Sequence, residues 1–218
     1  MTAPHRTEPG PLLVTCALRI ERFALGRGAR PEDGTRILRT GMGPRAARRG
    51  VLRALSGESG VSGEGASVRT AVAATGFCAG LVPGMRPGDL VLAEEVRDGG
   101  TVVPCTGTAA LTEALAPLGT LHTGTLAGTD HVVRGAERAA LRRSGALAVD
   151  MESAATLGTA ADTAPQRPVT AVRVVVDAPG HELLRVGTLG GGISAFRVLS
   201  TLLPALLAWH RSLQLPRR

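Results

Sequence analysis

Short runs of apolar residues, each ending in glycine, proline or a charged residue, recur along the chain and predict buried strands. Runs of about four to eight such residues with β-branched members are typical of strands that have both faces in a core. The expected strands cover residues 12–17, 36–40, 70–75, 120–126, 146–149 and 170–176. One more strand is expected after the turn at Met85, and residues 101–103 are expected to pair beside it.

Small and amphipathic residues between these runs predict helices. One helix is expected after the GMGP turn at residues 41–44, because proline suits an early helical position. Further helices are expected at residues 109–115 and 135–143, and a single amphipathic helix at 193–213 closes the chain. The glycine-bounded segment 76–80 predicts a tight turn after its strand.

The order of these elements indicates an α/β fold. Strands recur with helices between some of them and with paired strands in the middle, so we expect three layers: helices on both sides of a central, mixed and mainly parallel sheet. Residues 11–213 are expected to form a single domain, and the polar, proline-containing residues 1–10 a disordered N-terminus.

Acidic residues and glycine turns gather where the expected strands end. In open α/β sheets the ligand binds beyond the carboxyl ends of the strands. Glu21, Glu152 and Asp177 and the glycine segments 41–43 and 76–80 all fall at such ends. The segment around Glu152 reads GALAVDMESAA, and its two acids, Asp150 and Glu152, have two interpretations. They are either ligand-binding carboxylates that share one side of a strand end, or an ordinary N-cap with a first-turn acid.

Three carboxylates at strand ends suit a polyhydroxylated substrate. One carboxylate can accept hydrogen bonds from two sugar hydroxyls, a second can protonate a leaving group, and a third can take a proton from water. Cleavage of an N-glycosidic bond needs these three roles, because the sugar becomes oxocarbenium-like while the departing base takes up a proton. The three carboxylates could therefore serve the roles that N-glycosidic cleavage needs.

Composition excludes several other classes of function. Aromatic residues make up 2% of the chain and tyrosine is absent, so a base-stacking nucleic-acid surface is not expected. The net charge of +7 comes entirely from arginine. Arg45, Arg48, Arg49 and Arg53 share a helical face, interpreted as a solvated face or as peripheral contact with an anionic membrane. The apolar run 198–208, interrupted by Pro204, is too short to span a bilayer.

Cysteine usage indicates a reducing compartment. The three cysteines form no C-x-x-C pair and leave an odd thiol, which argues against a disulfide framework and against a metal site. No secretory signal is evident at the N-terminus, so we expect a cytoplasmic protein, peripheral to the inner face of the membrane if it contacts lipid. No cofactor is expected beyond water or inorganic phosphate as co-substrate.

Six motifs follow one another in the order LLVTCALRIE, RTGMGP, ATGFCAGL, RPGDLVLAEEV, AVDMESAA and VRVVVDAP. This ordered set, over residues 12–179, resembles the nucleoside phosphorylase and nucleosidase superfamily, whose members are purine nucleoside phosphorylase-like. Within it, TGTLAGTDHVV and the leucine-rich tail after GGGISAF resemble the hopanoid-associated branch. Members of that branch are thought to release adenine from adenosylhopane. The related alternatives are 5′-methylthioadenosine/S-adenosylhomocysteine nucleosidase and futalosine hydrolase.

The resemblance implies roles for individual residues. Asp177 would donate a proton to the purine N7, and Glu21 would orient the attacking water. Glu152 would hold the ribose hydroxyls and Met151 would pack against the sugar. Residues lining the nucleophile, sugar or base would be Gly43, Gly76, Phe77 and His131. The resemblance also implies a homodimer.

The residues leave the nucleophile open between water and phosphate. Bacterial phosphorylases of this superfamily place an arginine and a serine where this chain has Ala74 and Phe77, so both phosphate ligands are missing. Arg45 or Arg173 could replace them. Two other classes remain as alternatives: a dinucleotide-binding protein, from the GxGxxA pattern at residues 41–46, and a nucleoside-binding module without turnover.

Overall fold

The computed structural model describes residues 10–29, 34–57, 70–179 and 188–213. Its strands are β1 (Leu12–Cys16), β2 (Thr35–Arg39), β3 (Ala71–Gly80), β4 (Leu90–Asp98), β5 (Thr101–Pro104), β6 (Leu121–Gly128), β7 (Ala146–Asp150) and β8 (Val169–Asp177). Its helices are α1 (Arg19–Gly26), α2 (Pro44–Gly57), α4 (Thr108–Leu115), α5 (Gly135–Arg143), α6 (Ser153–Thr163), α7 (Thr188–Leu199) and α8 (Leu202–Ser212), with a short 3₁₀ helix at Ala116–Leu118.

The eight described strands form one mixed sheet. Its order is β2-β1-β3-β7-β6-β4-β5, and β8 pairs with both β3 and β4. The pairs β1–β2, β1–β3, β3–β8, β4–β6 and β6–β7 are parallel, whereas β3–β7, β4–β5 and β4–β8 are antiparallel. The expectation of a mixed, mainly parallel sheet is confirmed. Because β8 joins β3 to β4, the strands β3, β7, β6, β4 and β8 close into a ring, as in a small barrel.

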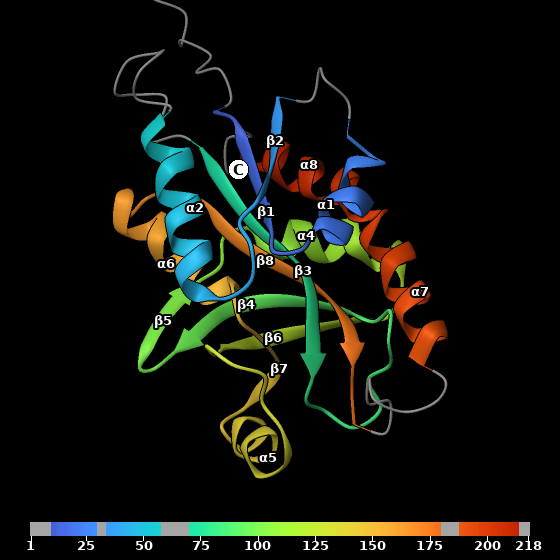
Figure 1. Cartoon of the computed structure of the whole chain (residues 1–218). Coiled ribbons are helices and arrows are strands. Elements are labelled where there is room, and N and C mark those ends of the chain that lie inside the picture. The colour runs from blue at the N-terminus through green and yellow to red at the C-terminus, as the bar shows by residue number, and fades with distance from the viewer. Residues whose placement is uncertain (1–9, 30–33, 58–69, 180–187, 214–218) are drawn as a thin grey trace, which may run out of the picture.

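Helices cover both faces of the sheet, as Figure 1 shows. One core cluster joins the sheet to α1, α4, α7 and α8, and the second joins its other face to α2 and α6. Successive residues of β8 alternate between the two clusters: Val172 and Val174 belong to the first, Ala171 and Val175 to the second. Strands buried on both faces explain why the sequence shows continuous apolar runs rather than alternation. The predicted three-layer arrangement is confirmed.

The predicted turn at residues 76–80 is wrong. β3 continues to Gly80, pairing with β8 as far as Ala79 and with β7 at Ala79 and Gly80. Glycine inside a strand marks a close approach of another group rather than a chain reversal. The approaching groups at Gly76 are described below.

The predicted single helix at the C-terminus is also wrong. α7 ends at Leu199 and α8 begins at Leu202, with a break between them. Pro204 is the third residue of α8, where its missing N–H is harmless, but a continuous helix would press its ring on the carbonyl of Ser200. The stretch Gly192–Ser212 is long and apolar enough to cross a membrane. However, Leu202, Leu206 and Trp209 are fully buried in the first core cluster, which makes α8 a core element.

The predicted disordered N-terminus, residues 1–10, lies almost wholly outside the described residues. The other predicted helices and strands match the observed elements to within two residues at most boundaries. The sheet and its flanking helices therefore fix where the candidate residues lie.

Candidate active site

Glu21 joins the start of α1 to β3. Its side chain is buried on the inner face of the helix, with a relative exposure of 2%. Oε2 accepts hydrogen bonds from the backbone N–H groups of Ala17 and Leu18, both at 2.8 Å, and Oε1 accepts one from the N–H of Phe77 at 2.8 Å. A carboxylate oxygen can accept two hydrogen bonds, so Oε1 keeps one free acceptor position beside Phe77.

Gly76 provides the space for this arrangement. Its φ angle is +129°, which L side chains rarely adopt. A Cβ atom at this position would lie 2.6 Å from Oε1 of Glu21 and 2.9 Å from Nη1 of Arg173. The glycine is therefore required by the two charged side chains that approach β3.

Arg173 and Asp150 form a buried ion pair behind Glu21. Nε of Arg173 lies 2.5 Å from Oδ2 of Asp150 and donates to Oγ of Ser153 at 2.9 Å, while Nη1 donates to the carbonyl of Thr75 at 2.9 Å. Burial tends to lower the pKa of Arg173, but the charges of Asp150, Glu152 and Glu21 outweigh it and raise that pKa. This arginine is thus a fixed positive charge among three carboxylates.

Asp150 also closes the N-terminus of α6. Its Oδ1 accepts hydrogen bonds from the N–H groups of Ser153 at 2.9 Å and Glu152 at 3.1 Å, and Oδ2 accepts one from Oγ of Ser153 at 2.6 Å. The N-cap residue of α6 is Glu152, so the N-cap interpretation with Asp150 as the cap and Glu152 as the first-turn acid is wrong in its positions. Asp150 binds the first N–H groups of the helix from two residues before the N-cap, and its carboxylate is fully used within the protein.

Glu152, the N-cap residue of α6, is partly buried. Its Oε1 accepts a hydrogen bond from the N–H of Gly43 at 2.7 Å, which ties the end of β7 to the GMGP segment before α2. Burial raises the pKa of Glu152, and the positive charge of Arg173 opposes this shift. Met151, between the two acids, is partly buried. The N–H of Gly43 thus binds this carboxylate, which argues against a dinucleotide phosphate at the GxGxxA pattern.

Asp177 ends β8 and is held by one oxygen only. Nη1 of Arg138, on α5, lies 2.9 Å from Oδ2, and Nη2 of the same arginine donates to the carbonyl of Gly80 at 2.6 Å. Oδ1 of Asp177 is buried and has no hydrogen-bond partner among the residues that the structure describes. A buried polar atom without a partner loses the stabilisation of water and gains nothing in return, so it is a ready acceptor or donor for a ligand.

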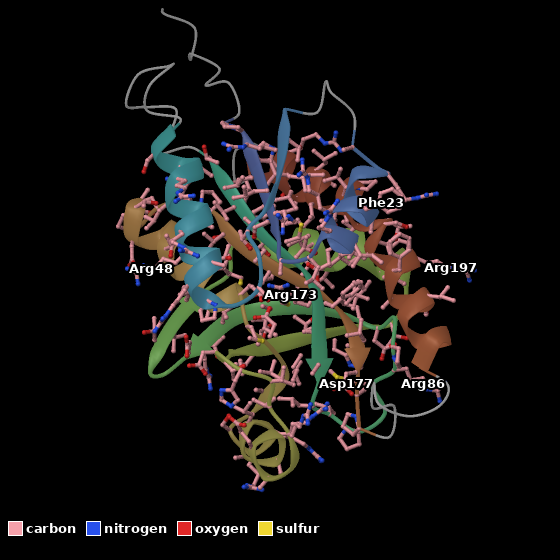
Figure 2. The ribbon with its side chains drawn as sticks, viewed as in Figure 1. Phe23, Arg48, Arg86, Arg173, Asp177 and Arg197 are labelled. Carbon is pink, nitrogen blue, oxygen red and sulfur yellow. The ribbon has the colours of Figure 1, made fainter. Side chains whose placement is uncertain are left out.

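Strand register places Asp177 and Glu152 around the same segment of β3. Ala79 is the partner of Asp177 on one side and of Val149 on the other. Since neighbouring strands lie about 4.8 Å apart, the Cα atoms of Asp177 and Val149 are about 10 Å apart. β7 runs antiparallel to β3, so its end leads back toward Phe77, where Glu21 is bound. Figure 2 shows Arg173 near the centre of the molecule and Asp177 further along β8.

His131 lies at the surface of the protein. Its side chain is 57% exposed, with Nδ1 2.7 Å from Asp130 and Nε2 2.9 Å from Glu137. Hydrogen bonds from Asp130 and Glu137 raise the pKa of His131. Both ring nitrogens are engaged with surface acids, and a ligand contact for His131 stays a prediction, as do those for Met151, Gly43, Gly76 and Phe77.

Sequence reasoning missed Arg138. The residue stands in a helix with two other arginines, and nothing local distinguishes it. Its role depends on contacts with Asp177 and Gly80, which lie far away along the chain. By contrast, Asp150 stands just before a helical pattern, and a short acid at such a place is a readable signal for a side chain that caps a helix N-terminus.

The described residues support neither a metal site nor a thiol nucleophile. No group of three or more metal-binding side chains occurs among them. Burial raises the pKa of Cys16 and of Cys105 to about 12, and it raises that of Cys78 as well. Thiols so far from ionisation are poor nucleophiles at neutral pH.

Comparison with known proteins gives a family match over most of the chain and matches to solved structures at low identity. The model of the phosphorylase superfamily matches residues 31–187. A search of curated proteins gave no match. The fold is similar to that of 5′-methylthioadenosine/S-adenosylhomocysteine nucleosidase from Streptococcus pneumoniae, solved with a transition-state inhibitor, at 18% identity and a TM-score of 0.69 over 93% of this chain and 99% of that one. It is also similar to futalosine hydrolase from Helicobacter pylori, at 13% identity and a TM-score of 0.71 over 91% and 97% of the two chains.

Proposed function

This chain belongs to the phosphorylase superfamily and is an enzyme that cleaves N-glycosidic bonds; we propose that it hydrolyses an adenosine derivative and releases adenine. The observation that carries this proposal is the buried, unpartnered Oδ1 of Asp177, at the end of a strand that flanks the same segment of β3 as the strand before Glu152. A site with an unused acid oxygen suits proton transfer to a leaving group.

Each acid has one step in the proposed reaction. Asp177, as the acid, gives its proton to N7 of the purine while the C1′–N9 bond breaks and its electron pair passes to the base. Water then adds to C1′, and its proton passes to the free acceptor position on Oε1 of Glu21. Arg138 fixes the other oxygen of Asp177, so the orientation of the acid is set before the substrate binds.

Glu152 holds the ribose in this scheme. One carboxylate can accept hydrogen bonds from the 2′- and 3′-hydroxyls, and such bonds strengthen as positive charge develops on the sugar. The N–H of Gly43 fixes Oε1 of Glu152 at 2.7 Å and leaves Oε2 for the sugar. Met151, beside it, would pack against the ring.

The site favours water over phosphate. Ala74 is fully buried and Phe77 offers no polar side-chain group, so neither can bind a phosphate oxygen. Arg173, a candidate replacement, already donates to Ser153 and to the carbonyl of Thr75 and pairs with Asp150. A phosphate dianion needs a dense set of free donors, whereas a water molecule needs only a well-placed acceptor such as Glu21.

For the 5′ substituent we propose an apolar, lipid-linked group, as in adenosylhopane, and hence a role in hopanoid lipid biosynthesis. Partly buried apolar residues extend from the Glu21 side of β3 toward α7: Phe77, Val176, Phe196 and Val198 all pack at the edge of the first core cluster. The resemblance of the sequence to the hopanoid-associated branch supports the same substrate. Methylthioadenosine, adenosylhomocysteine and aminofutalosine are the alternatives.

An adenine-release assay tests both parts of the proposal. The purified enzyme is incubated with adenosylhopane, methylthioadenosine, adenosylhomocysteine and aminofutalosine, each with and without inorganic phosphate. We expect release of adenine from at least one of them at a rate that phosphate does not change. The sugar product should carry a hydroxyl rather than a phosphate at C1′. Asp177→Asn is expected to lower kcat roughly a hundred- to ten-thousand-fold. The control Asp162→Asn, at an exposed acid on α6, is expected to leave it unchanged.

The outcomes separate the alternatives. A strict requirement for phosphate would overturn the hydrolytic mechanism but keep the cleavage. Preference for methylthioadenosine or aminofutalosine over adenosylhopane would overturn the lipid-linked substrate. Tight binding of nucleosides with no turnover of any of them would leave a nucleoside-binding module and overturn the proposal as a whole.

A further inference from the structure

The outward face of α1 carries a stripe of arginines with one phenylalanine among them. Arg19, Arg22, Phe23, Gly26 and Arg27 are all exposed, whereas Glu21, Ala24 and Leu25 point into the protein. The exposed positions are spaced by three, one, three and one residues, which places them on a single helical face. Glu21, the proposed base, is therefore on the opposite side of the same helix.

This stripe borders a hollow whose lining contains no acid among the described residues. The hollow has a volume of about 580 Å³ and is lined by the five stripe residues together with Arg39, at the end of β2. Among the described residues, none of its four arginines forms an ion pair with a carboxylate. The uncompensated positive charge makes the hollow attractive to anions.

A second hollow is also lined by arginines, but acidic residues in its lining balance their charge. It has a volume of about 310 Å³ and lies between α2, α6 and β5, and its lining contains Asp98 and Asp162 as well as Arg45 and Arg48. Its charges are balanced locally, so it offers less attraction to a distant anion. The face of α2 that the sequence suggested for membrane contact is therefore the weaker candidate.

Exposed apolar side chains stand next to the α1 stripe. Ile20 is 53% exposed and Phe23 63% exposed on α1, and Ile193 on α7 is 52% exposed. The ring of Phe23 stacks on that of Phe196 of α7 with 6.2 Å between centroids, so the two helices form one surface. Figure 2 shows Phe23 of α1 and Arg197 of α7 along the same edge of the molecule. Large exposed apolar residues that cluster mark an interaction surface.

We propose that this surface, formed by the outward face of α1, the end of β2 and the part of α7 around Ile193 and Phe196, docks on an anionic lipid bilayer. The arginines would contact lipid phosphates while Ile20, Phe23 and Ile193 enter the boundary with the acyl chains, as amphipathic basic helices do at membrane interfaces. A self-complementary dimer through this face would bring arginine against arginine, which argues against a second copy of the chain as occupant. A soluble anion would bind the arginines without contacting the exposed apolar side chains, so it would not explain why they cluster there.

Co-sedimentation with lipid vesicles tests the proposal without any substrate, so its result is independent of the proposed activity. The probes are vesicles of phosphatidylcholine alone and of phosphatidylcholine with about one-third phosphatidylglycerol. We expect binding to the anionic vesicles only, and we expect it to weaken at least tenfold when sodium chloride rises from low concentration to half molar. Equal binding to neutral vesicles, or no binding to either, would overturn the proposal.

Matched variants locate the surface. The triple variant Arg19→Gln, Arg22→Gln and Arg27→Gln is expected to lower vesicle affinity at least tenfold. The control triple Arg48→Gln, Arg49→Gln and Arg53→Gln removes the same charge from exposed positions of α2 and is expected to change it less than twofold. If both triple variants lost vesicle affinity equally, the attraction would depend on net charge alone, and the proposed surface would be overturned. Circular dichroism and thermal melting of each variant confirm that the fold is intact.

Phe23→Ser separates a bilayer from the other occupants. We expect it to weaken vesicle binding while leaving sedimentation velocity in solution unchanged. Conversion of an oligomer to a monomer by this variant would show instead that the face joins two copies. Competition by glycerol 1-phosphate at constant ionic strength, together with unchanged vesicle binding of Phe23→Ser, would show a site for a free phosphate. Either result would overturn the docking of a bilayer.

Discussion

Asp150 and Asp177 end two strands that flank β3, and each pairs with an arginine, yet their surroundings differ. Both oxygens of Asp150 are used, by Arg173, by the hydroxyl of Ser153 and by two backbone N–H groups. Asp177 pairs with Arg138 through Oδ2, and its Oδ1 is buried without a partner. The carboxylate of Asp150 has no acceptor position left for a further hydrogen bond, whereas one whole oxygen of Asp177 is unused.

This difference separates a structural acid from a reactive one. A ligand that approached Asp150 would have to break hydrogen bonds that already compensate a buried charge, which is costly. A ligand that approaches Asp177 meets an oxygen whose loss of hydration has not been compensated, and a hydrogen bond there is a net gain. Acid type and position in the sequence are similar in the two cases, so the number of unused acceptor positions is the informative quantity.

The largest effect is expected from removing the saturated carboxylate. Asp150→Ala leaves Arg173, which is 1% exposed, without its closest counter-charge. Breaking a buried ion pair in this way costs about 3–5 kcal/mol in the free energy of unfolding. Urea denaturation measures the loss, and Asp162→Ala, at an exposed acid of α6, serves as the control. An Asp150→Ala protein that unfolds at the wild-type urea concentration would show that Asp150 is not structural.

Gly76→Ala tests the contact between the two regions. The new Cβ would lie 2.6 Å from Oε1 of Glu21, at a φ angle of +129° that alanine rarely adopts. Backbone strain of this kind costs about 1–3 kcal/mol, and the displaced Glu21 should also lower the rate of adenine release. Measurement of both urea stability and kcat is needed.

Gly158→Ala provides the contrast, because nothing lies within 4 Å of its Cβ position in α6. Alanine in a helix interior is expected to raise stability by up to about 1 kcal/mol there. If Gly76→Ala behaved like Gly158→Ala, the close packing of Glu21 against β3 would not constrain the site.

Much of the fold was predictable from the sequence for a physical reason. Strands buried on both faces give continuous apolar runs, and β1 and β8 were visible in this way. The segment from Gly76 to Gly80 was misread because glycine permits both a turn and a strand that other groups approach closely. The break between α7 and α8 carried a readable signal, since Pro204 restricts the residue four positions before it.

The site was predictable only where its residues are tied to strand ends. Asp177 is the last residue of β8, Glu152 comes two residues after β7, and Glu21 is in the first turn of the helix that follows β1, so their places depend on local sequence. Arg138 reaches Asp177 only because α5 packs beneath β7, and this packing is a property of the whole fold. No periodicity or spacing in a single sequence reports such a contact.

Arg138→Met tests whether Arg138 orients the carboxyl group of Asp177 for proton transfer. The variant removes the arginine from Oδ2 of Asp177 and from the carbonyl of Gly80 while keeping the length of the side chain. Loss of a charged hydrogen bond is worth about 1.5–3 kcal/mol, which corresponds to a loss in kcat of about tenfold or more if the bond orients the acid.

As a positioning residue, Arg138 should affect kcat more than KM, and Arg138→Lys should restore part of the rate. Arg142→Met, on the same helix, is the control and is expected to leave both constants unchanged. An equal fall in stability for Arg138→Met and Arg138→Lys without any change in kcat would mean that the pair only anchors α5 to the sheet.

The smallest effect concerns Glu152, whose pKa is raised by burial. A carboxyl group whose pKa is higher in the folded than in the unfolded protein favours folding most when it is protonated, below about pH 4, and this contribution is lost as the pH rises through the folded pKa. Glu152→Gln cannot ionise, yet its amide oxygen can still accept the N–H of Gly43. The variant should therefore become progressively more stable than the wild type between about pH 4 and pH 7. Urea midpoints of both proteins across this range measure the difference in stability, with Glu113→Gln, at an exposed acid of α4, as the control.

A stability difference that is constant, or that narrows as the pH rises, would contradict this prediction. It would mean that the ionised carboxylate of Glu152 is compensated in the free enzyme as fully as that of Asp150, and Glu152 would then belong with the structural acid rather than with Asp177.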